Sequence, residues 1–426
     1  MRVGIMTFNR AINYGAVLQS YALKKTILRL TDECEVINYK CDNIEKSASP
    51  FYIKSKKPKD IIVFLLQIFM RLKKNREFKK FTDRYLDTES CVLNCKSIAQ
   101  VKNRYDLIVL GSDQIWNYQI TGLDANYFGV FAGDKTVKAS YAASFGVSKI
   151  PESHLDDYTN YLSYIDIISV REPEGTRIVR ELTNKNSYQH IDPVFLLSKN
   201  EWSHLISDAS LMQDYILVYS INKSECYSVA QKLSDLTGLK IVGLQVSLSE
   251  RTKCKRVQTE SPDEFLNWFY HARYVITDSF HGTAFSILFE KKFMVCTGGG
   301  AKERLSRQTN LLDILGLSSR EYSGDIRLID HEIDYLTVNR IIQNERSKSI
   351  EYLSNVFSVV EKNKEKKIPI LFKNKDECCG CSACLSICPV GAITLEPDNE
   401  GFLYPSINQN KCICCYRCIN VCAFQK

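Results

Sequence analysis

The sequence lacks the features that define several classes of protein. The longest apolar run, from Ile61 to Met70, is interrupted by Gln67 and has about half of the ~20 residues that span a bilayer. No early basic and apolar stretch ends in a small-residue cleavage site, so we expect no secretory signal and a cytoplasmic protein. The glycines at 298–300 do not form a dinucleotide fingerprint. Basic residues are not spread over a recognisable nucleic-acid-binding fold, so no nucleic-acid partner is expected.

Positive charge is concentrated in one segment. The formal net charge is +7, but the segment from Lys54 to Lys80 holds ten Lys or Arg against Asp60 and Glu77, so its net charge is 10 − 2 = +8. A short apolar core with basic flanks leaves two interpretations open. The segment lies on an anionic membrane surface, at the inner face of the membrane, or it is a solvated helix whose apolar face packs on the domain.

Apolar runs bounded by glycine alternate with helical stretches over the first three quarters of the chain, as in parallel sheets covered on both faces. The predicted strands are 2–8, 34–39, 105–110, 139–144, 166–170, 215–219, 241–244, 274–276 and 293–296. The predicted helices are 16–30, 224–236, 262–272, 283–289, 305–315 and 332–362.

We therefore expect an α/β protein with two Rossmann-like domains that face one another across a cleft, where ligands bind at the carboxyl ends of the strands. A small ferredoxin-like domain follows them. The predicted domains are 1–164 and 165–360, followed by a linker at 361–376 and a cysteine-rich module at 377–426.

Ten of the 17 cysteines lie between Cys378 and Cys422, in two runs with C-x2-C-x2-C-x3-C spacing, and Pro389 ends the first run. Thiolates are the preferred ligands of iron–sulfur clusters, and the fourth cysteine of each such run binds the other cluster. Two [4Fe–4S] clusters are therefore predicted; a pair of zinc knuckles is the alternative. The predicted ligand sets are Cys378, Cys381, Cys384 and Cys422 for one cluster, and Cys412, Cys415, Cys418 and Cys388 for the other. The spacing leaves open whether the clusters pass electrons to a redox partner protein or are a structural appendage.

The segment from Tyr274 to Gly282 runs from a strand through a polar turn into a helix. A helix N-terminus favours phosphate, and a histidine there can exchange a proton near neutral pH. His281 is therefore a candidate catalytic residue. The alternative is that Asp278 and Ser279 cap the helix and His281 is an ordinary turn residue with its bonds satisfied.

Five motifs together resemble the polysaccharide pyruvyltransferase family over roughly residues 1 to 320. They are Asn13-Tyr14-Gly15, Gly111-Ser112-Asp113-Gln114-Ile115-Trp116, Ser169-Val170-Arg171-Glu172, Asp192-Pro193 and Thr277-Asp278-Ser279-Phe280-His281-Gly282. The resemblance implies two domains arranged as in type-B glycosyltransferases, with the acceptor on the side of 1–164 and phosphoenolpyruvate on the side of 165–360. It also implies transfer of pyruvate from phosphoenolpyruvate to a sugar of a capsule or exopolysaccharide precursor, with formation of a ketal. The acceptor is expected to be a lipid-linked or nucleotide-linked glycan.

The resemblance also assigns roles to residues. His281 is expected to protonate the vinyl carbon of phosphoenolpyruvate or to assist phosphate departure, and Arg171 to bind the donor. The alternative for Arg171 is an interdomain ion pair with Glu172 or Glu174. Arg304 and Arg307 are further donor candidates.

Ser279 stands where many relatives carry an arginine, so Arg304 or Arg307 replaces that charge or the donor binds differently. Gly282 is expected beside the donor. Asn13, Tyr14, Gly15, Asp113 and Gln114 are expected on the acceptor side, with ordinary turn chemistry as the alternative.

The module from Cys378 to Cys422 is also similar to the opening of the beta-subunit family of deazaflavin-linked hydrogenases and dehydrogenases. Two further functions therefore stand beside the transferase. One is an oxidoreductase or electron-transfer subunit linked to a flavin or deazaflavin, and the other is a non-catalytic glycan-binding protein.

Overall fold

The structure is a computed structural model that describes residues 1–51, 58–86, 88, 91–207, 214–221, 225–246, 253–257, 261–297, 302–365 and 368–424. The chain divides into two compact units. The first comprises Met1–Ala132 and Thr136–Ser354, and the second comprises Gly133–Lys135 and Asn355–Lys426.

The first unit begins with a parallel sheet in the order β2-β1-β3-β4. Its strands are β1 (Arg2–Met6), β2 (Glu33–Val36), β3 (Leu107–Leu110) and β4 (Val137–Ser140). All four residues of β3 are buried, as expected for a strand covered on both faces of a parallel sheet. The helices that precede β3 are α1 (Tyr14–Ile27), α2 (Asp42–Ala48) and α3 (Pro58–Tyr85).

This first sheet continues beyond the predicted domain boundary. Strand β5 (Ile168–Val170) is joined to the β4 region by bridges from Ile167 to Ala139 and from Val170 to Ala143. It pairs in turn with β6 (Ser187–Gln189), across helix α6 (Pro173–Thr183). This strand–helix–strand unit packs into the core of the first domain, beyond the predicted boundary between residues 164 and 165. Arg171, which follows β5, belongs to the first domain.

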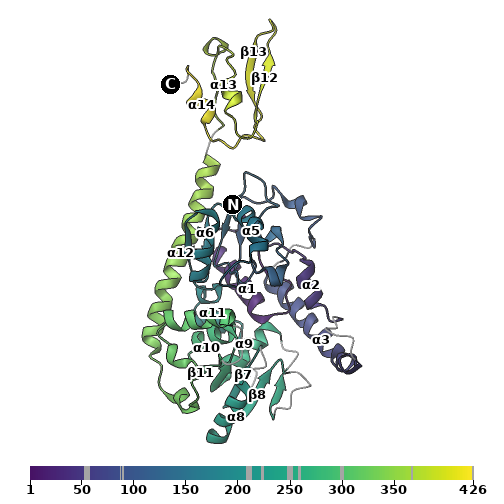
Figure 1. Cartoon of the computed structure of the whole chain (residues 1–426), viewed down its shortest axis with the longest axis vertical. Helices are drawn as coiled ribbons and strands as arrows, with labels where there is room; N and C mark the ends of the chain where they lie inside the picture. The colour runs from purple at the N-terminus through teal and green to yellow at the C-terminus, as the bar shows by residue number, and fades with distance from the viewer. Residues whose placement is uncertain are drawn as a thin grey trace. The chain divides into compact units, whose positions relative to one another are not determined.

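The second sheet is also parallel and has the order β11-β10-β7-β8-β9. Its strands are β7 (Tyr215–Tyr219), β8 (Lys240–Leu244), β9 (Lys255–Val257), β10 (Tyr274–Thr277) and β11 (Lys292–Val295). Its helices are α8 (Cys226–Thr237), α9 (Pro262–His271), α10 (Phe280–Leu288) and α11 (Lys302–Ile314), and Figure 1 shows them beside the strands. The two parallel sheets with helices between their strands confirm the predicted fold class.

The long helix α12 (Tyr335–Glu365) matches the predicted helix 332–362. The part of it within the first unit returns to the first sheet, where the Tyr352 hydroxyl donates to the carbonyl oxygen of Ser140 at 2.7 Å. Arg346 Nε donates to the carbonyl oxygen of Phe195 at 2.7 Å. This segment, which was predicted to belong wholly to the second domain, thus also contacts the first sheet.

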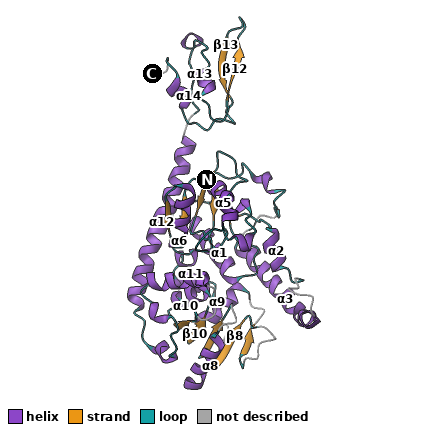
Figure 2. Ribbon diagram, in the orientation of Figure 1, coloured by secondary structure: helices purple, strands orange, loops and turns teal. Residues whose placement is uncertain are grey.

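The second unit contains a hairpin of two antiparallel strands and two short helices, which Figure 2 shows. The strands are β12 (Ile393–Pro397) and β13 (Leu403–Ile407), and the helices are α13 (Ala383–Ser386) and α14 (Arg417–Val421). Each helix begins inside one of the two cysteine runs. Among the described residues, none of the helices combines the length and apolar content that a membrane crossing requires.

Candidate active site between the two sheets

His281 lies in the first turn of α10, because the helix begins at Phe280 and not at residue 283 as predicted. Ser279 is the N-cap, and its Oγ accepts a bond from the amide of Gly282 at 3.3 Å. A Cβ on Gly282 would lie 2.3 Å from Thr277 Oγ1, so only glycine allows this close approach of α10 to β10. The first turn of α10 thus places His281 at the carboxyl edge of the second sheet.

The imidazole of His281 lies against the first turn of α1, in the other domain. Asn13 caps α1, and its side-chain oxygen accepts from the amide of Ala16 at 3.3 Å. A Cβ on Gly15 would lie only 2.0 Å from His281 Nδ1. Glycine is therefore required at position 15 for the ring to occupy this place, and the two motifs meet as parts of one site.

Asp192 places a carboxylate beside His281. Its side chain is fully buried, and its Oδ2 lies 3.6 Å from His281 Nε2, which is longer than a hydrogen bond. The same Oδ2 accepts from Arg171 Nη1 at 2.6 Å, and Oδ1 accepts from the amide of Val194 at 3.1 Å. Burial acts to raise the pKa of Asp192, but His281, Arg171 and the Val194 amide hold that pKa at about 2. Asp192 is therefore an ionised carboxylate beside the imidazole.

Arg171 makes its bonds to carboxylates of the protein. Its side chain is 4% exposed, and Nε donates to Glu172 at 2.8 Å while Nη2 lies 3.8 Å from Asp113. Burial acts to lower the pKa of Arg171, but Glu172, Asp192 and Asp113 raise it, so the guanidinium is charged. Its Cζ also lies 4.7 Å from the centre of the Phe280 ring. The guanidinium thus orders Asp192 and Phe280 around His281. It does pair with Glu172, as the alternative interpretation has it, but within one domain and not between domains.

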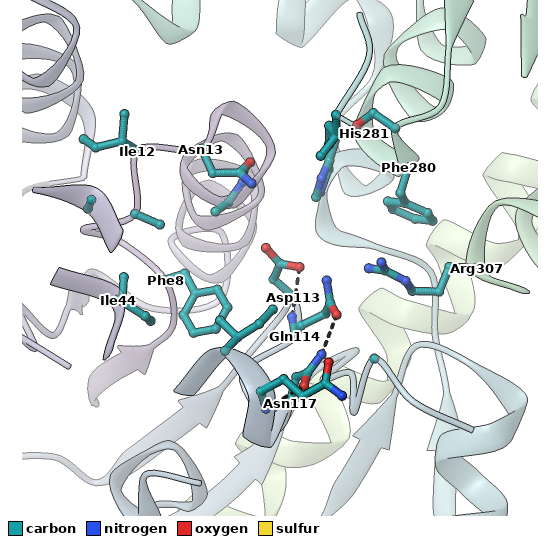
Figure 3. A pocket seen from close by; sticks show the side chains of 18 of the residues that line it. Phe8, Ile12, Asn13, Ile44, Asp113, Gln114, Asn117, Phe280, His281 and Arg307 are labelled. Atoms are coloured by element: carbon teal, nitrogen blue, oxygen red, sulfur yellow. Dashed lines mark hydrogen bonds between the residues drawn. The ribbon is translucent and has the colours of Figure 1, made fainter. Parts of the chain in front are cut away.

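A cavity of about 740 Å³ lies between the two sheets, and residues of both domains line it. Figure 3 shows Asn13, Asp113, Gln114, His281 and Arg307 turned toward this common space. Of the predicted site residues, the cavity is lined by Asn13, Asp113, Gln114, Ser279, His281 and Arg307.

Other predicted residues contribute around the cavity without lining it: Gly15 and Gly282 by allowing close packing, and Arg171 through Asp192. The side chain of Arg304 lies outside the described part of the chain.

Arg307, on α11, is a cation of the second domain that lines the cavity. When the Gln114 carboxamide turns its oxygen toward Arg307, that oxygen lies 3.0 Å from Nη1 and 3.3 Å from Nη2. In the opposite orientation of the carboxamide, its oxygen instead accepts from Asn117 Nδ2 at 2.9 Å. Asp113 adopts a left-handed backbone conformation with φ of 71° and accepts the Gln114 amide at 2.9 Å. The cavity wall therefore offers a guanidinium beside amide and carboxylate groups that suit hydroxyls.

Tyr14 does not line the cavity. Its ring is buried and stacks on Phe265 of α9, with ring centres 4.5 Å apart and planes 17° apart. Lys74 Nζ lies over the same ring at 4.9 Å from its centre. The prediction that Tyr14 binds the acceptor is therefore not supported, because its ring forms the packing contact between the two domains.

Asp192, Asn117 and Gln308 are contributors that the sequence did not assign to the site. Gln308 Nε2 donates to the carbonyl oxygen of Asp278 at 2.6 Å, and the Asp278 carboxylate accepts from the amide of Ile221 at 2.7 Å. These bonds hold the turn before α10. The Asp192-Pro193 pair was a recognisable signal, but its spatial relation to His281 was not readable from the spacing.

In the second unit, four cysteines line one small cavity whose other walls are mainly apolar: Cys388, Cys412, Cys415 and Cys418. They are the predicted second ligand set. Among the described residues, no three His, Cys, Asp or Glu side chains converge on a point that would hold one metal ion. A cubane binds its four thiolates at four separate irons, so its ligands surround a cavity and do not converge on a point. The four cysteines around this cavity suit the four thiolates that a cubane binds.

The first set is also gathered in part. Burial raises the pKa of the Cys384 thiol, and the neighbouring Cys378 and Cys381 thiols raise it further. The fourth predicted member, Cys422, follows α14 (Arg417–Val421), and α14 packs against α13, which holds Cys384.

Two parallel α/β sheets with a polar cavity at the carboxyl ends of their strands define a two-domain protein with a ligand site between the domains. A model of the polysaccharide pyruvyl transferase family matches residues 13–299, and the chain belongs to this family. Residues 377–426 match the 4Fe-4S dicluster domain, so the chain joins a transferase domain that acts on polysaccharides to an iron–sulfur domain. No curated protein matches the chain.

Several solved structures are similar to the chain at low identity. The UDP-GlcNAc 2-epimerase of Methanocaldococcus jannaschii has 11% identity and a TM-score of 0.43, with 84% of this chain and 100% of that one covered. The ADP-heptose LPS heptosyltransferase II of E. coli has 12% identity and a TM-score of 0.33, with 81% and 99% covered. The glycosyltransferase SnogD of Streptomyces nogalater has 11% identity and a TM-score of 0.40, with 84% and 99% covered. At this level of similarity, the substrate of one protein cannot be assigned to another.

Proposed function

We propose that the chain transfers pyruvate from phosphoenolpyruvate to two hydroxyls of a sugar in a polysaccharide precursor and forms a pyruvate ketal. The observation that carries the proposal is the state of His281. Its Nε2 is buried and has no hydrogen-bond partner among the described residues, yet its ring lines the cavity that both domains share. A buried ring nitrogen without a partner favours a bound ligand over a structural role.

The donor carries a phosphate and a carboxylate, and the second domain offers the groups that bind anions. Arg307 supplies a guanidinium at the cavity, and the start of α10 supplies the positive end of a helix. Arg307 thereby replaces the arginine that many relatives carry where this chain has Ser279, whose side chain is the cap of α10. We retain Arg171 as a site residue but assign it the positioning of Asp192.

In the proposed reaction His281 is the one acid–base group of the protein, and inorganic phosphate takes up the proton of the second hydroxyl. The imidazolium gives a proton to the methylene carbon of phosphoenolpyruvate, and the cationic centre that forms is attacked by one sugar hydroxyl. The proton of that hydroxyl returns to the imidazole. The second hydroxyl attacks the same carbon, the bond from that carbon to the phosphate oxygen breaks, and the second hydroxyl proton leaves with inorganic phosphate. The ionised Asp192 carboxylate lies 3.6 Å from Nε2 of this ring.

The test is a screen of phosphoenolpyruvate with lipid-linked and nucleotide-linked galactose and N-acetylhexosamine acceptors, read as phosphate release and as acceptor mass. Product should require an acceptor and should fall by about 10²–10⁴-fold in His281→Ala, the usual contribution of a general acid. His204→Ala, which removes an exposed histidine, is the matched control. A folded protein that binds no phosphoenolpyruvate in calorimetry, or a His281→Ala protein with full activity, would overturn the proposal.

We further propose that the C-terminal domain holds two [4Fe–4S] clusters on the eight cysteines of the two predicted sets. Such clusters supply one-electron transfer when bound. Anaerobic purification should give about eight irons per chain with matching sulfide, and Cys415→Ala should lose one cluster's worth of iron. Zinc in place of iron would contradict this.

The dicluster domain also supports a second candidate function. In this alternative the chain is an electron-transfer subunit with a redox partner and a flavin or deazaflavin. Copurification of such a cofactor would favour it. A non-catalytic glycan-binding protein would instead retain acceptor affinity in His281→Ala and consume no donor. The activity of Cys381→Ala and of Cys415→Ala shows whether catalysis requires the clusters. We place the protein in the cytoplasm, at the inner face of the membrane.

A further inference from the structure

Helix α3 (Pro58–Tyr85) carries the basic segment, and its C-terminal half is packed on the first domain. Phe78 and Phe81 are 2% and 3% exposed, and their rings contact Tyr14 and Tyr21 of α1. Asn75 Nδ2 donates to the carbonyl oxygen of Ala48 at 3.2 Å, and Ala48 lines the 740 Å³ cavity. The helix is thus firmly attached to the wall of the site.

The N-terminal half of α3 presents apolar side chains outward. Ile61, Leu65, Phe69 and Leu72 follow one another at intervals of four, four and three residues, which places them on one face of a helix. They are 38%, 60%, 80% and 40% exposed. These four exposed residues are named here the outer stripe.

Cations continue along the same side of the helix. Lys73 and Arg76 are exposed, one and four residues after the end of the outer stripe. Lys79 and Lys80 follow, and they pair with Asp83 and Glu77. The basic segment from 54 to 80 has a net charge of +8, whereas the whole chain has +7. An exposed apolar stripe beside this concentration of cations is the pattern of a helix that lies in a membrane interface.

We propose that the outer stripe and its cations bind an anionic bilayer surface. A second copy of this chain would be a poor occupant, because a twofold contact places the same surface on both partners and would bring the two basic segments together. An anionic bilayer satisfies both features at once, because acyl chains take up the apolar side chains and headgroups face the cations. The proposal does not depend on the transferase activity, but it would hold the cavity close to a lipid-linked acceptor.

The test uses a tryptophan reporter in the full-length holo-protein. Trp116, Trp202 and Trp268 are 0%, 0% and 5% exposed, and the chain has only these three tryptophans. Phe69→Trp therefore adds one exposed fluorophore on the outer stripe. We expect its emission to shift to the blue and iodide quenching to fall when vesicles containing phosphatidylglycerol are added, and not with neutral phosphatidylcholine vesicles.

Sedimentation with the same vesicles measures binding of the wild type and its variants. Leu65→Gln with Phe69→Gln should abolish vesicle binding, whereas Leu236→Gln with Leu336→Gln should not, although these leucines are similarly exposed at 62% and 83%.

Lys73→Gln with Arg76→Gln should weaken partitioning about 30-fold, from the contribution that each cation makes near an anionic surface. Lys102→Gln with Lys240→Gln is the charge-matched control, because both lysines are exposed.

Two outcomes would overturn the proposal. One is a residue 69 tryptophan that stays accessible to iodide with anionic vesicles at low salt. The other is a wild type that forms dimers which Leu65→Gln with Phe69→Gln dissociates, without any vesicle binding. His281→Ala should bind vesicles as the wild type does, so failure of the catalytic proposal leaves this result readable.

Discussion

Gly15→Ala tests the contact on which the site geometry depends. The added methyl carbon would lie 2.0 Å from His281 Nδ1, whereas ordinary contact begins at 3.4 Å, so the ring must move by 3.4 − 2.0 = 1.4 Å or more. A misplacement of about 1 Å in a catalytic group costs about 10²-fold in rate. We therefore expect kcat to fall by about 10²-fold, with a smaller effect on KM.

The same substitution has a stability consequence that a double-mutant cycle isolates. Overpacking costs about 1–3 kcal/mol, whereas alanine in place of glycine inside a helix contributes up to about 1 kcal/mol of stability. Urea unfolding should thus show Gly15→Ala to be destabilising in the wild type, and neutral or stabilising in His281→Ala, where the clash is absent. Equal effects in both backgrounds, or an unchanged kcat, would refute the inferred place of the ring.

Three other predictions concern charged side chains of the site. Asp192 has a pKa of about 2 in the folded protein against 3.8 ordinarily, so its contribution to stability is present above pH 3.8 and is lost as pH falls toward 2; acid unfolding of Asp192→Asn should lack this dependence. Arg171→Lys keeps the positive charge but loses the planar guanidinium, whose several N–H groups bind more than one carboxylate. We expect kcat to fall about tenfold or more while the KM for phosphoenolpyruvate changes little. Arg307→Gln should instead raise the KM for phosphoenolpyruvate about tenfold or more, because it removes a charge-assisted bond to the donor.

The strands were predictable because they are short, apolar and buried. The predicted strand 215–219 coincides with β7, all five residues of which are buried. The division into domains was not predictable, because a strand–helix–strand pattern does not state which sheet receives it. Strand β5 joined the first sheet through two bridges, and only the fold reveals this. The polar strand β9 gave no apolar signal at all.

Within the site, single residues were predictable and their pairings were not. His281 and Asp113 were identified from motifs, and both line the cavity. The partners of Arg171 lie 58 residues before it at Asp113 and 21 residues after it at Asp192, and spacing along the chain carries no information about such a network. Likewise, the sequence did not show which apolar side chains of the basic segment are exposed, as Phe69 is, and which are buried, as Phe78 is.

Protonation of the donor by His281 is tested most directly by running the reaction in D2O, with phosphoenolpyruvate and the best acceptor of the screen. We predict a ketal whose methyl group carries one deuterium, formed in step with inorganic phosphate, and neither product above background in His281→Ala. A pyruvylated product with no deuterium in its methyl group, or one formed equally well without His281, would contradict protonation of the donor by this residue.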